Sequence, residues 1–231
     1  VVNLSYQYST LDAQVEAVQS QPVKRSYNDF TYFAMGNFNF NKQNSLRVFL
    51  MSSTDNPRIQ QLNNILDISN MQYVSNGNEN LNPAYSHRFN MHYNYTNLEK
   101  ARTFMWMFSA HTQQNYISSS TLYCPTGFRL TQFGDIEIPK NQQGENYTPQ
   151  RITSYENMDG YWNLRTHMSL GLPLSFMKCN LNIMAGVNYT VMPSAVYGSV
   201  ENMIAHKYTV NHANNIGYDA SVTLGSNISE N

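Results

Sequence analysis

The sequence predicts an all-β fold, an antiparallel up-and-down transmembrane β-barrel segment of about eight strands. Three observations predict it. Apolar and polar residues alternate with a period of two along most of the 231 residues. Short and long connections alternate between these runs. Only 13% of the residues are charged while 13% are aromatic, so the surface is polar without carrying much charge.

The alternation is clearest in three stretches, residues 88–95, 162–172 and 180–191. In the first of these, Phe, Met and Tyr residues alternate strictly with polar ones. A helical period of 3.6 would scatter those residues over every side, so each run predicts a strand with one apolar and one polar face. The predicted strands cover residues 2–9, 30–40, 46–54, 86–96, 102–121, 151–173, 179–191 and 213–228, with one helical turn expected near residues 11–18.

The connections between these strands alternate in length, which is typical of an outer-membrane barrel with short turns at one end and long loops at the other. A soluble β-sandwich would break this alternation, because its Greek-key crossings mix connection lengths. A run as long as residues 151–173 also exceeds the usual sandwich strand. The short connections are residues 41–45, 97–101 and 174–178; the long ones are residues 10–29, 55–85, 122–150 and 192–212.

Aromatic residues gather near the predicted strand ends. Such rings suit the two interfacial girdles of a membrane barrel, although the ordinary strand propensity of aromatics explains part of the pattern. The residues are Tyr6, Tyr8, Phe30, Tyr32, Phe38, Phe40, Tyr93, Tyr95, Tyr161 and Trp162.

The balance of charges and the length of the apolar runs exclude two classes of protein, those that bind nucleic acid and those that span a membrane with helices. Lys and Arg number 14 against 15 Asp and Glu, for a net charge of −1, so nucleic acid is not expected as a partner. The densest apolar run, residues 104–108, ends at Ser109 and is far too short for a membrane-spanning helix. The two cysteines, Cys124 and Cys179, lie far apart and are interpreted as isolated thiols.

The sequence offers no catalytic signature. None of the six histidines forms a His-x-x-x-His pair, and no carboxylate lies at metal-ligand spacing from any of them. A nucleophile elbow, a phosphate-binding loop and a dinucleotide fingerprint are also missing from the sequence. We therefore expect no enzyme activity, no metal and no cofactor.

Two of the long connections contain candidate ligand-binding residues. The connection 55–85 offers amide groups and one aromatic ring, and the connection 122–150 interleaves aromatics with glycines. That chemistry suits sugars, peptides or chelates equally, and the alternative is a solvated loop that packs on its own barrel. The candidate residues are Gln72, Tyr73, Asn76, Asn78, Tyr123 and Arg129.

The connection 55–85 contains three sequence elements that resemble those of a known family. It contains Asp-Asn-Pro-Arg-Ile-Gln-Gln-Leu at residues 55–62, Asp-Ile-Ser-Asn at 67–70 and Gly-Asn-Glu-Asn-Leu-Asn-Pro at 77–83. These elements resemble the barrel region of TonB-dependent outer-membrane receptors of the Bacteroidetes type. Glu79 stands where that family usually has a proline.

Two further elements, residues 24–29 and 157–160, extend the resemblance over most of residues 24–174. It implies a barrel of about 22 strands closed around an N-terminal plug domain. Residues 1–231 would then be a single β-barrel region, a fragment of a longer receptor with no plug domain of its own.

The resemblance also implies a role: extracellular loops capture a nutrient, and TonB drives its uptake. The implied location is the outer membrane of a Gram-negative bacterium. The implied partners are outer-membrane lipid, with the plug domain and TonB lying outside this chain, and the resemblance admits a surface lipoprotein as a further partner.

Two alternatives remain open from the residues alone. One is a small self-closed outer-membrane barrel with a structural or adhesive role, since eight strands are enough to close. The other is a secreted β-sandwich binding module. The two folds differ in where they place the same apolar side chains. The sandwich buries them together in one dry core, whereas the barrel turns them outward as an apolar belt. These residues are Phe89, Met91, Leu170, Leu172, Leu181 and Ile183.

Overall fold

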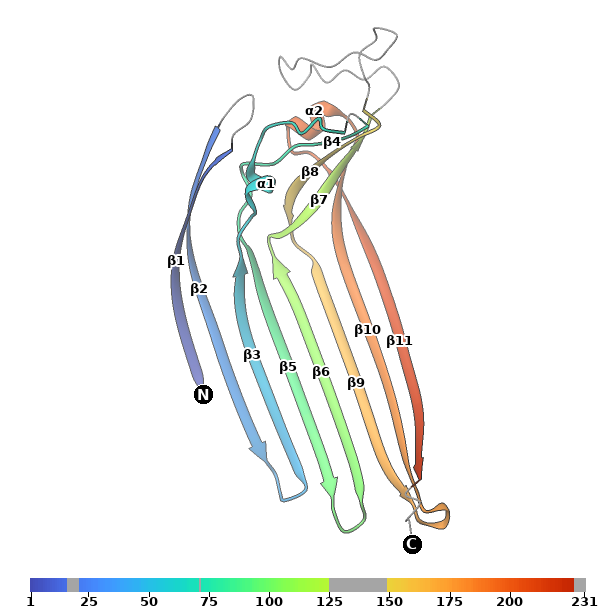
Figure 1. Ribbon diagram of the computed structural model, residues 1–231. Coiled ribbons are helices and arrows are strands. Elements are labelled where there is room, and N and C mark those ends of the chain that lie inside the picture. The colour runs from blue at the N-terminus through green and yellow to red at the C-terminus, as the bar shows by residue number, and fades with distance from the viewer. Residues whose placement is uncertain (16–20, 71, 125–148, 227–231) are drawn as a thin grey trace.

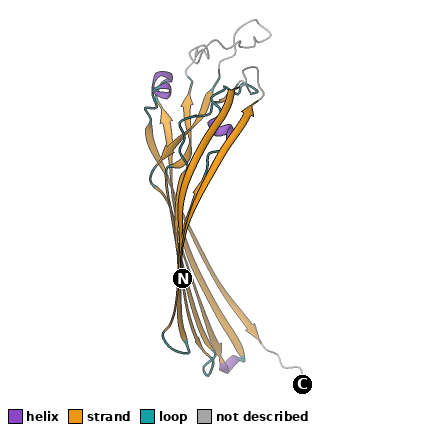
Figure 2. Ribbon diagram, turned by 90° about the vertical axis from the view of Figure 1, so that its left-hand side faces the viewer, coloured by secondary structure: helices purple, strands orange, loops and turns teal. Residues whose placement is uncertain are grey.

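The computed structural model describes residues 1–15, 21–70, 72–124 and 149–226, which form one large, strongly twisted β-sheet (Figures 1 and 2). The strands are β1 (Val2–Val15), β2 (Gln21–Asn39), β3 (Asn44–Asp55), β4 (Tyr73–Ser75), β5 (Ala84–Asn97), β6 (Arg102–Gln114), β7 (Tyr116–Tyr123), β8 (Arg151–Met158), β9 (Tyr161–Leu174), β10 (Cys179–Tyr197) and β11 (Thr209–Ser226). The helices are α1 (Ile59–Leu62), the 3-10 turn η2 (Ser175–Met177) and α2 (Val200–Ile204).

The long strands follow one another antiparallel in the order β1-β2-β3-β5-β6-β9-β10-β11. Short turns join β2 to β3, β5 to β6 and β9 to β10 at one end, which lies at the bottom of Figure 1. The long connections, with α1, α2 and β4, lie at the other end. The sheet is open: among the described residues β1 pairs only with β2, and β11 only with β10.

The prediction of an all-β, mostly antiparallel fold is confirmed, but the strand count of about eight is not, because the described residues alone form a sheet of eleven strands. The predicted strands 102–121 and 151–173 are each divided in two, into β6 and β7 and into β8 and β9. The additional strand β4 lies inside the connection predicted as a loop at 55–85. Two parallel pairings, β10 with β7 and β4 with β8, also depart from a simple up-and-down order.

The first hairpin is longer than the sequence predicts. The described parts of the predicted loop, residues 10–15 and 21–29, are strand, since β1 and β2 stay paired from Val2 with Ala34 as far as Val15 with Gln21. The helical turn expected from residue 11 is replaced by strand over Leu11–Val15, and residues 16–18 lie outside the described chain. In the sequence Leu11, Ala13 and Val15 alternate with Asp12 and Gln14, which fits this strand, while pairs of the other parity, such as Thr10 with Ser26, are polar.

The register sorts the side chains onto two faces, because directly paired residues point to the same side of a sheet. One row crosses six strands and is apolar throughout, in the pairing order Leu50, Phe89, Ala110, Leu164, Tyr189 and Ile216. The adjacent row on the opposite face is mostly polar, in the order Phe49, Asn90, Ser109, Arg165, Asn188 and Gly217. The sheet therefore has an apolar face and a polar face.

The apolar face is not the core of a sandwich. Leu50 is 41% exposed, and Ile183 and Val187 are each 37% exposed, so no second layer covers them. The structure therefore contradicts the sandwich alternative. It also shows that the polar face is mixed rather than purely polar, because Phe33 pairs with Met51 and Met35 with Phe49 on that face.

Aromatic side chains lie toward both ends of the apolar face. On β2, Phe30 and Tyr32 lie toward the long-loop end while Phe38 lies near the short turn, with Ala34 and Gly36 between them on the same face. Successive residues of one face are separated by about 6.6 Å along a strand, so Phe30 and Phe38 lie about 26 Å apart. That distance matches the apolar band of a membrane barrel, which is about 25 Å tall. Within the described residues, no helix is long and apolar enough to span a membrane.

Candidate functional site

The buried core lies at the long-loop end, in a unit that we call the cap and define as α1, β4, β7, β8 and α2. The cap begins where β6 gives way to β7 at Asn115, and where β8 gives way to β9 at Gly160. These two residues have φ angles of 53° and 100°, the region that asparagine and glycine tolerate best. The Asn115 amide N–H donates to Asp159 Oδ1 at 3.0 Å, which fixes the kink.

At this kink the hairpin strands exchange neighbours. Below it, β6 lies beside β5 and β9 lies beside β10. Above it, β7 pairs with β10 in parallel and β8 pairs with β4, so the two strands have changed sides. Figure 1 shows β7 and β8 crossing above the ends of β6 and β9. The hairpin therefore branches from the long strands but stays joined to them through β10, and we call β4, β8 and β7 the small sheet.

One face of the small sheet is the core of the cap. Val74, Ile152 and Leu122 form a row across β4, β8 and β7, and each is at most 1% exposed. Tyr197 of β10 pairs with Leu122 and extends the row, and α2 covers it with Val200 and Met203. Burying such side chains contributes about 1.5–3 kcal/mol each, so the cap has a core that orders it.

A buried carboxylate lies beside this core. Glu156 of β8 accepts a hydrogen bond from the Tyr197 hydroxyl at 2.5 Å, and its Oε1 lies 2.6 Å from His206 Nδ1. Burial raises the pKa of the Tyr197 phenol, and the hydrogen bond to Glu156 raises it further. Ser199 caps the start of α2 by accepting from the Asn202 amide at 3.2 Å. The network thus holds α2 and its following turn against β8.

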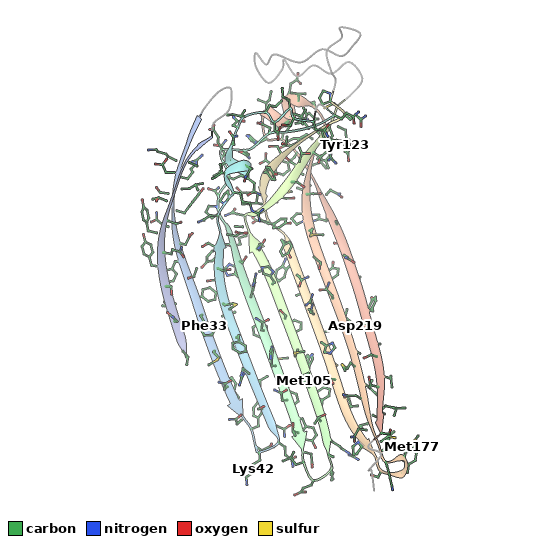
Figure 3. The ribbon with its side chains drawn as sticks, viewed as in Figure 1. Phe33, Lys42, Met105, Tyr123, Met177 and Asp219 are labelled. Carbon is green, nitrogen blue, oxygen red and sulfur yellow. The ribbon has the colours of Figure 1, made fainter. Side chains whose placement is uncertain are left out.

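The other face of the small sheet presents an aromatic and cationic surface. Tyr73, Arg151 and Tyr123 are direct partners on β4, β8 and β7, and we call them the Tyr-Arg-Tyr row. The Arg151 guanidinium carbon lies 5.2 Å from the centre of the Tyr73 ring, the distance of a cation–π contact. Tyr73 is 49% exposed and Tyr123 is 69% exposed. Figure 3 shows Tyr123 near the top of the molecule, at the opposite end from Lys42 and Met177.

The next row on this face carries three hydroxyl groups, from Ser75, Thr153 and Thr121. Together the two rows combine aromatic rings, one guanidinium and several hydroxyls on one accessible surface. Such a surface can stack against the flat side of a ligand while Arg151 donates hydrogen bonds to an anionic or carbonyl oxygen.

The predicted ligand-binding residues are separated in the structure. Tyr73 and Tyr123 meet on either side of Arg151. Gln72 is exposed in the adjoining turn, and its backbone oxygen accepts from the Gln150 amide at 3.0 Å. Arg129 lies outside the described residues.

The other two predicted residues make contacts within their own loop. The Asn76 side chain donates to Asn64 Oδ1 at 3.0 Å. Asn78 is buried and donates to the Tyr155 carbonyl at 2.9 Å. Their amide donors thus hold the loop to β8 and to itself.

Sequence reasoning missed Arg151 and Glu156. Both belong to a segment interpreted as the start of a long membrane strand, and Tyr197 and His206 were assigned to the connection 192–212. The contacts of Glu156 join residues 41 and 50 positions apart, a separation that no local pattern encodes. In the described chain, no three His, Cys, Asp or Glu residues are grouped so as to hold a metal ion.

Comparisons with known proteins show which family this chain belongs to. No curated protein sequence matches this chain. Among solved structures it is similar to the G324V mutant of the ferric enterobactin receptor PfeA from Pseudomonas aeruginosa, with a TM-score of 0.47 and 10% identity. That match covers 83% of this chain and 30% of the receptor chain, so the chain spans under a third of that protein's length.

The family model of the outer membrane protein beta-barrel family matches residues 4–230. A match over nearly the whole chain agrees with the apolar and polar faces of the sheet and with the band between its aromatic ends. It confirms the family membership and the location predicted from the sequence. This chain belongs to the outer membrane protein beta-barrel family, and it lies in the outer membrane of a Gram-negative bacterium.

Proposed function

We propose that this chain forms part of the wall and the outer cap of a TonB-dependent receptor, which captures a nutrient at the cap and imports it without chemical change. The observation that carries the proposal is the Tyr-Arg-Tyr row, an exposed binding surface on an ordered small sheet at the long-loop end. In outer-membrane barrels the longer loops are extracellular, so this surface faces the medium.

The chemistry of the row suggests the kind of ligand. Neighbouring strands lie about 4.8 Å apart, so the row of three residues is about 10 Å wide. That width suits a ring or a flat group that contacts one or both tyrosines. The guanidinium of Arg151 then favours a ligand with an oxygen-rich or negatively charged substituent, because it donates several hydrogen bonds in one plane.

The open sheet supports a larger barrel. In a bilayer the unpaired backbone groups of β1 and β11 would be costly, so we infer that further strands pair with both edges. Outer-membrane lipid covers the apolar face. The remaining partners of the proposal are a plug domain within the completed barrel, TonB in the periplasm and a surface lipoprotein above the cap.

Binding at the cap is tested with the whole gene product, purified in detergent from its own outer membranes. Native mass spectrometry identifies small molecules that copurify with it, and their affinity is then measured for Tyr73→Ala, Tyr123→Ala and Arg151→Ala variants. We expect each substitution to weaken binding by about tenfold or more, equivalent to about 1.4 kcal/mol or more. The control is Arg58→Ala, an exposed arginine of the same connection that lies outside the row.

Uptake is tested separately with the ligand so identified. Cells that lack TonB should bind it at their surface but fail to accumulate it, while the Arg151→Ala variant should fail at both steps. Wild-type affinity in all three row variants would contradict the binding site. Uptake that persists without TonB would contradict the transport mechanism while leaving the binding site in place.

A further inference from the structure

The three short turns at the end opposite the cap share one composition. They join β2 to β3, β5 to β6 and β9 to β10, so successive turns lie two strand spacings, or about 10 Å, apart along this end of the sheet. All three lie at the bottom of Figure 1. We call these turns the basic rim, which comprises residues 40–43, 98–102 and 175–178.

The charge of the basic rim is predominantly positive. Four cationic residues stand against one carboxylate, that of Glu99, which leaves the rim at +3, whereas the whole chain has a net charge of −1. The four cations are exposed, and no ion pair among the described residues involves any of them. They are Lys42, Lys100, Arg102 and Lys178. Such a surface attracts a negatively charged partner.

Each turn of the basic rim also exposes a large apolar side chain. Phe40 is 65% exposed, Leu98 is 87% exposed and Phe176 is 83% exposed. Each of them precedes the lysine of its turn by two residues, so an apolar-x-Lys element occurs three times. Exposed apolar side chains gathered at one place mark a surface that contacts a protein or a membrane. The repeated element therefore requires a partner that is both apolar and negatively charged.

The basic rim continues the apolar face of the sheet. Tyr95 pairs with Phe104 on that face, and Arg102 is the next residue of β6 on the same face, about 6.6 Å closer to the turn. At a membrane surface, aromatic rings lie at the level of the headgroups, and long cationic side chains extend beyond them into the polar layer. The order of Phe104 and Arg102 along β6 is the order that such a surface requires.

We propose that the basic rim binds anionic phospholipid headgroups of the outer-membrane leaflet that faces the periplasm. Short turns of outer-membrane barrels lie on the periplasmic side, which places the rim at this leaflet. Lysine and arginine donate hydrogen bonds to the phosphate oxygens, and Phe40, Leu98 and Phe176 insert among the acyl chains beside the headgroups. The inference rests on the proposed contact with outer-membrane lipid, and it adds the class of lipid and the place where it binds.

Both components of the apolar-x-Lys element favour a lipid over other negatively charged partners. An acidic protein or an acidic cell-wall polymer supplies the negative charge, but it does not supply the continuous apolar layer that the exposed side chains need. A zwitterionic lipid supplies the apolar layer without net charge. Each basic side chain close to an anionic lipid surface strengthens the attraction by about fivefold, so the charges of the rim give a measurable preference for anionic lipid.

The test uses the whole gene product, purified in detergent and freed of copurified lipid. Native mass spectrometry measures its affinity for phosphatidylglycerol and for phosphatidylcholine with the same acyl chains. We expect the wild type to bind phosphatidylglycerol at least about tenfold more tightly. Replacing the three lysines of the rim by glutamine should weaken phosphatidylglycerol binding by more than about tenfold and leave phosphatidylcholine binding unchanged.

Two further variants separate charge from apolar contact. Glu99→Gln raises the charge of the rim by one and should tighten phosphatidylglycerol binding by about fivefold, a gain that a folding defect cannot imitate. Phe176→Ser removes an apolar contact and should weaken the binding of both lipids by the same factor. The matched control is Lys207→Gln, the same substitution at an exposed lysine of the cap end, which should leave both affinities unchanged. Folding of each variant is checked by circular dichroism.

Four results would overturn the proposal. Equal affinity of the wild type for the two lipids would remove the preference, and wild-type selectivity in the triple lysine variant would remove the site. A loss of selectivity in Lys207→Gln would move the site to the cap end. Equally tight binding of glycerol phosphate, which lacks acyl chains, would show a site for free anions instead of a lipid surface. Because none of these measurements involves the nutrient, the basic rim and the Tyr-Arg-Tyr row stand or fall separately.

Discussion

Glu156 shows how a single side chain can join distant parts of this chain. It lies on β8, and its carboxylate contacts Tyr197 at the end of β10 and His206 in the turn after α2. A buried carboxylate with two such partners is costly to leave unpaired. Removing either partner should therefore loosen α2 from the small sheet rather than affect the large sheet below.

The Tyr197 phenol gives this network a predictable dependence on pH. Its pKa is raised in the folded cap above the ordinary value of 10.0, so the folded state holds the phenol proton more tightly than the unfolded state does. The resulting stabilisation is fully present below pH 10.0 and is lost as the pH rises above that value toward the raised pKa.

We therefore expect cap stability, followed by near-ultraviolet circular dichroism during urea titration, to fall above pH 10 in the wild type. The Tyr197→Phe variant is the control, because it has no phenol to ionise and should lose less stability over the same pH range. Equal pH dependence in the two proteins would show that Tyr197 ionisation does not control the cap.

At the scale of elements, the kink at Asn115 and Gly160 converts a membrane hairpin into a cap. Gly160 has a φ of 100°, and a Cβ at this position would meet only His212 Cε1 at 3.6 Å. A side chain at residue 160 is therefore unfavourable because of the backbone conformation, not because space is lacking. Non-glycine residues held in such a conformation cost about 1–3 kcal/mol.

Gly160→Ala should accordingly destabilise the protein by about 1–3 kcal/mol, measured as a lower midpoint of urea unfolding in lipid vesicles. Asn115→Gly is the control: its φ of 53° suits glycine, so the kink should be kept with only a small effect on stability. A neutral Gly160→Ala would mean that the kink relaxes without loss.

The same elements show what sequence reasoning can and cannot reach. Strands β5, β9 and β10 were predictable because lipid on one face and water on the other impose a local alternation, as in residues 88–95. The outer part of β1 and β2 was not predicted, because its alternation covers only residues 11–15 and pairs such as Asp12 with Lys24 are polar. The candidate site was only half predictable. Tyr73 and Tyr123 stand out as aromatics in polar connections, but Arg151 joins them only through strand pairing.

The whole molecule is organised by the difference between its two faces. An apolar row and a mostly polar row run side by side across six strands, and this arrangement makes sense only if each face meets a different solvent. The polar face still carries Phe33, Met35, Phe49 and Met51. Hydrophobicity alone therefore does not show which residues face lipid, so a direct test at matched positions is needed.

Met91 and Asn90 provide that test, because they are neighbours on β5 and point to opposite faces. Met91 lies near the middle of the apolar band, between Tyr85 and Tyr95. A lysine at the lipid-facing midplane of a barrel costs about 2–4 kcal/mol, because its charge must leave water. We expect Met91→Lys to lower the stability of the protein in lipid vesicles by that amount, measured by urea titration, and Asn90→Lys to have a small effect. The reverse order would mean that the apolar face lines the interior, and it would contradict both the membrane orientation and the receptor function built upon it.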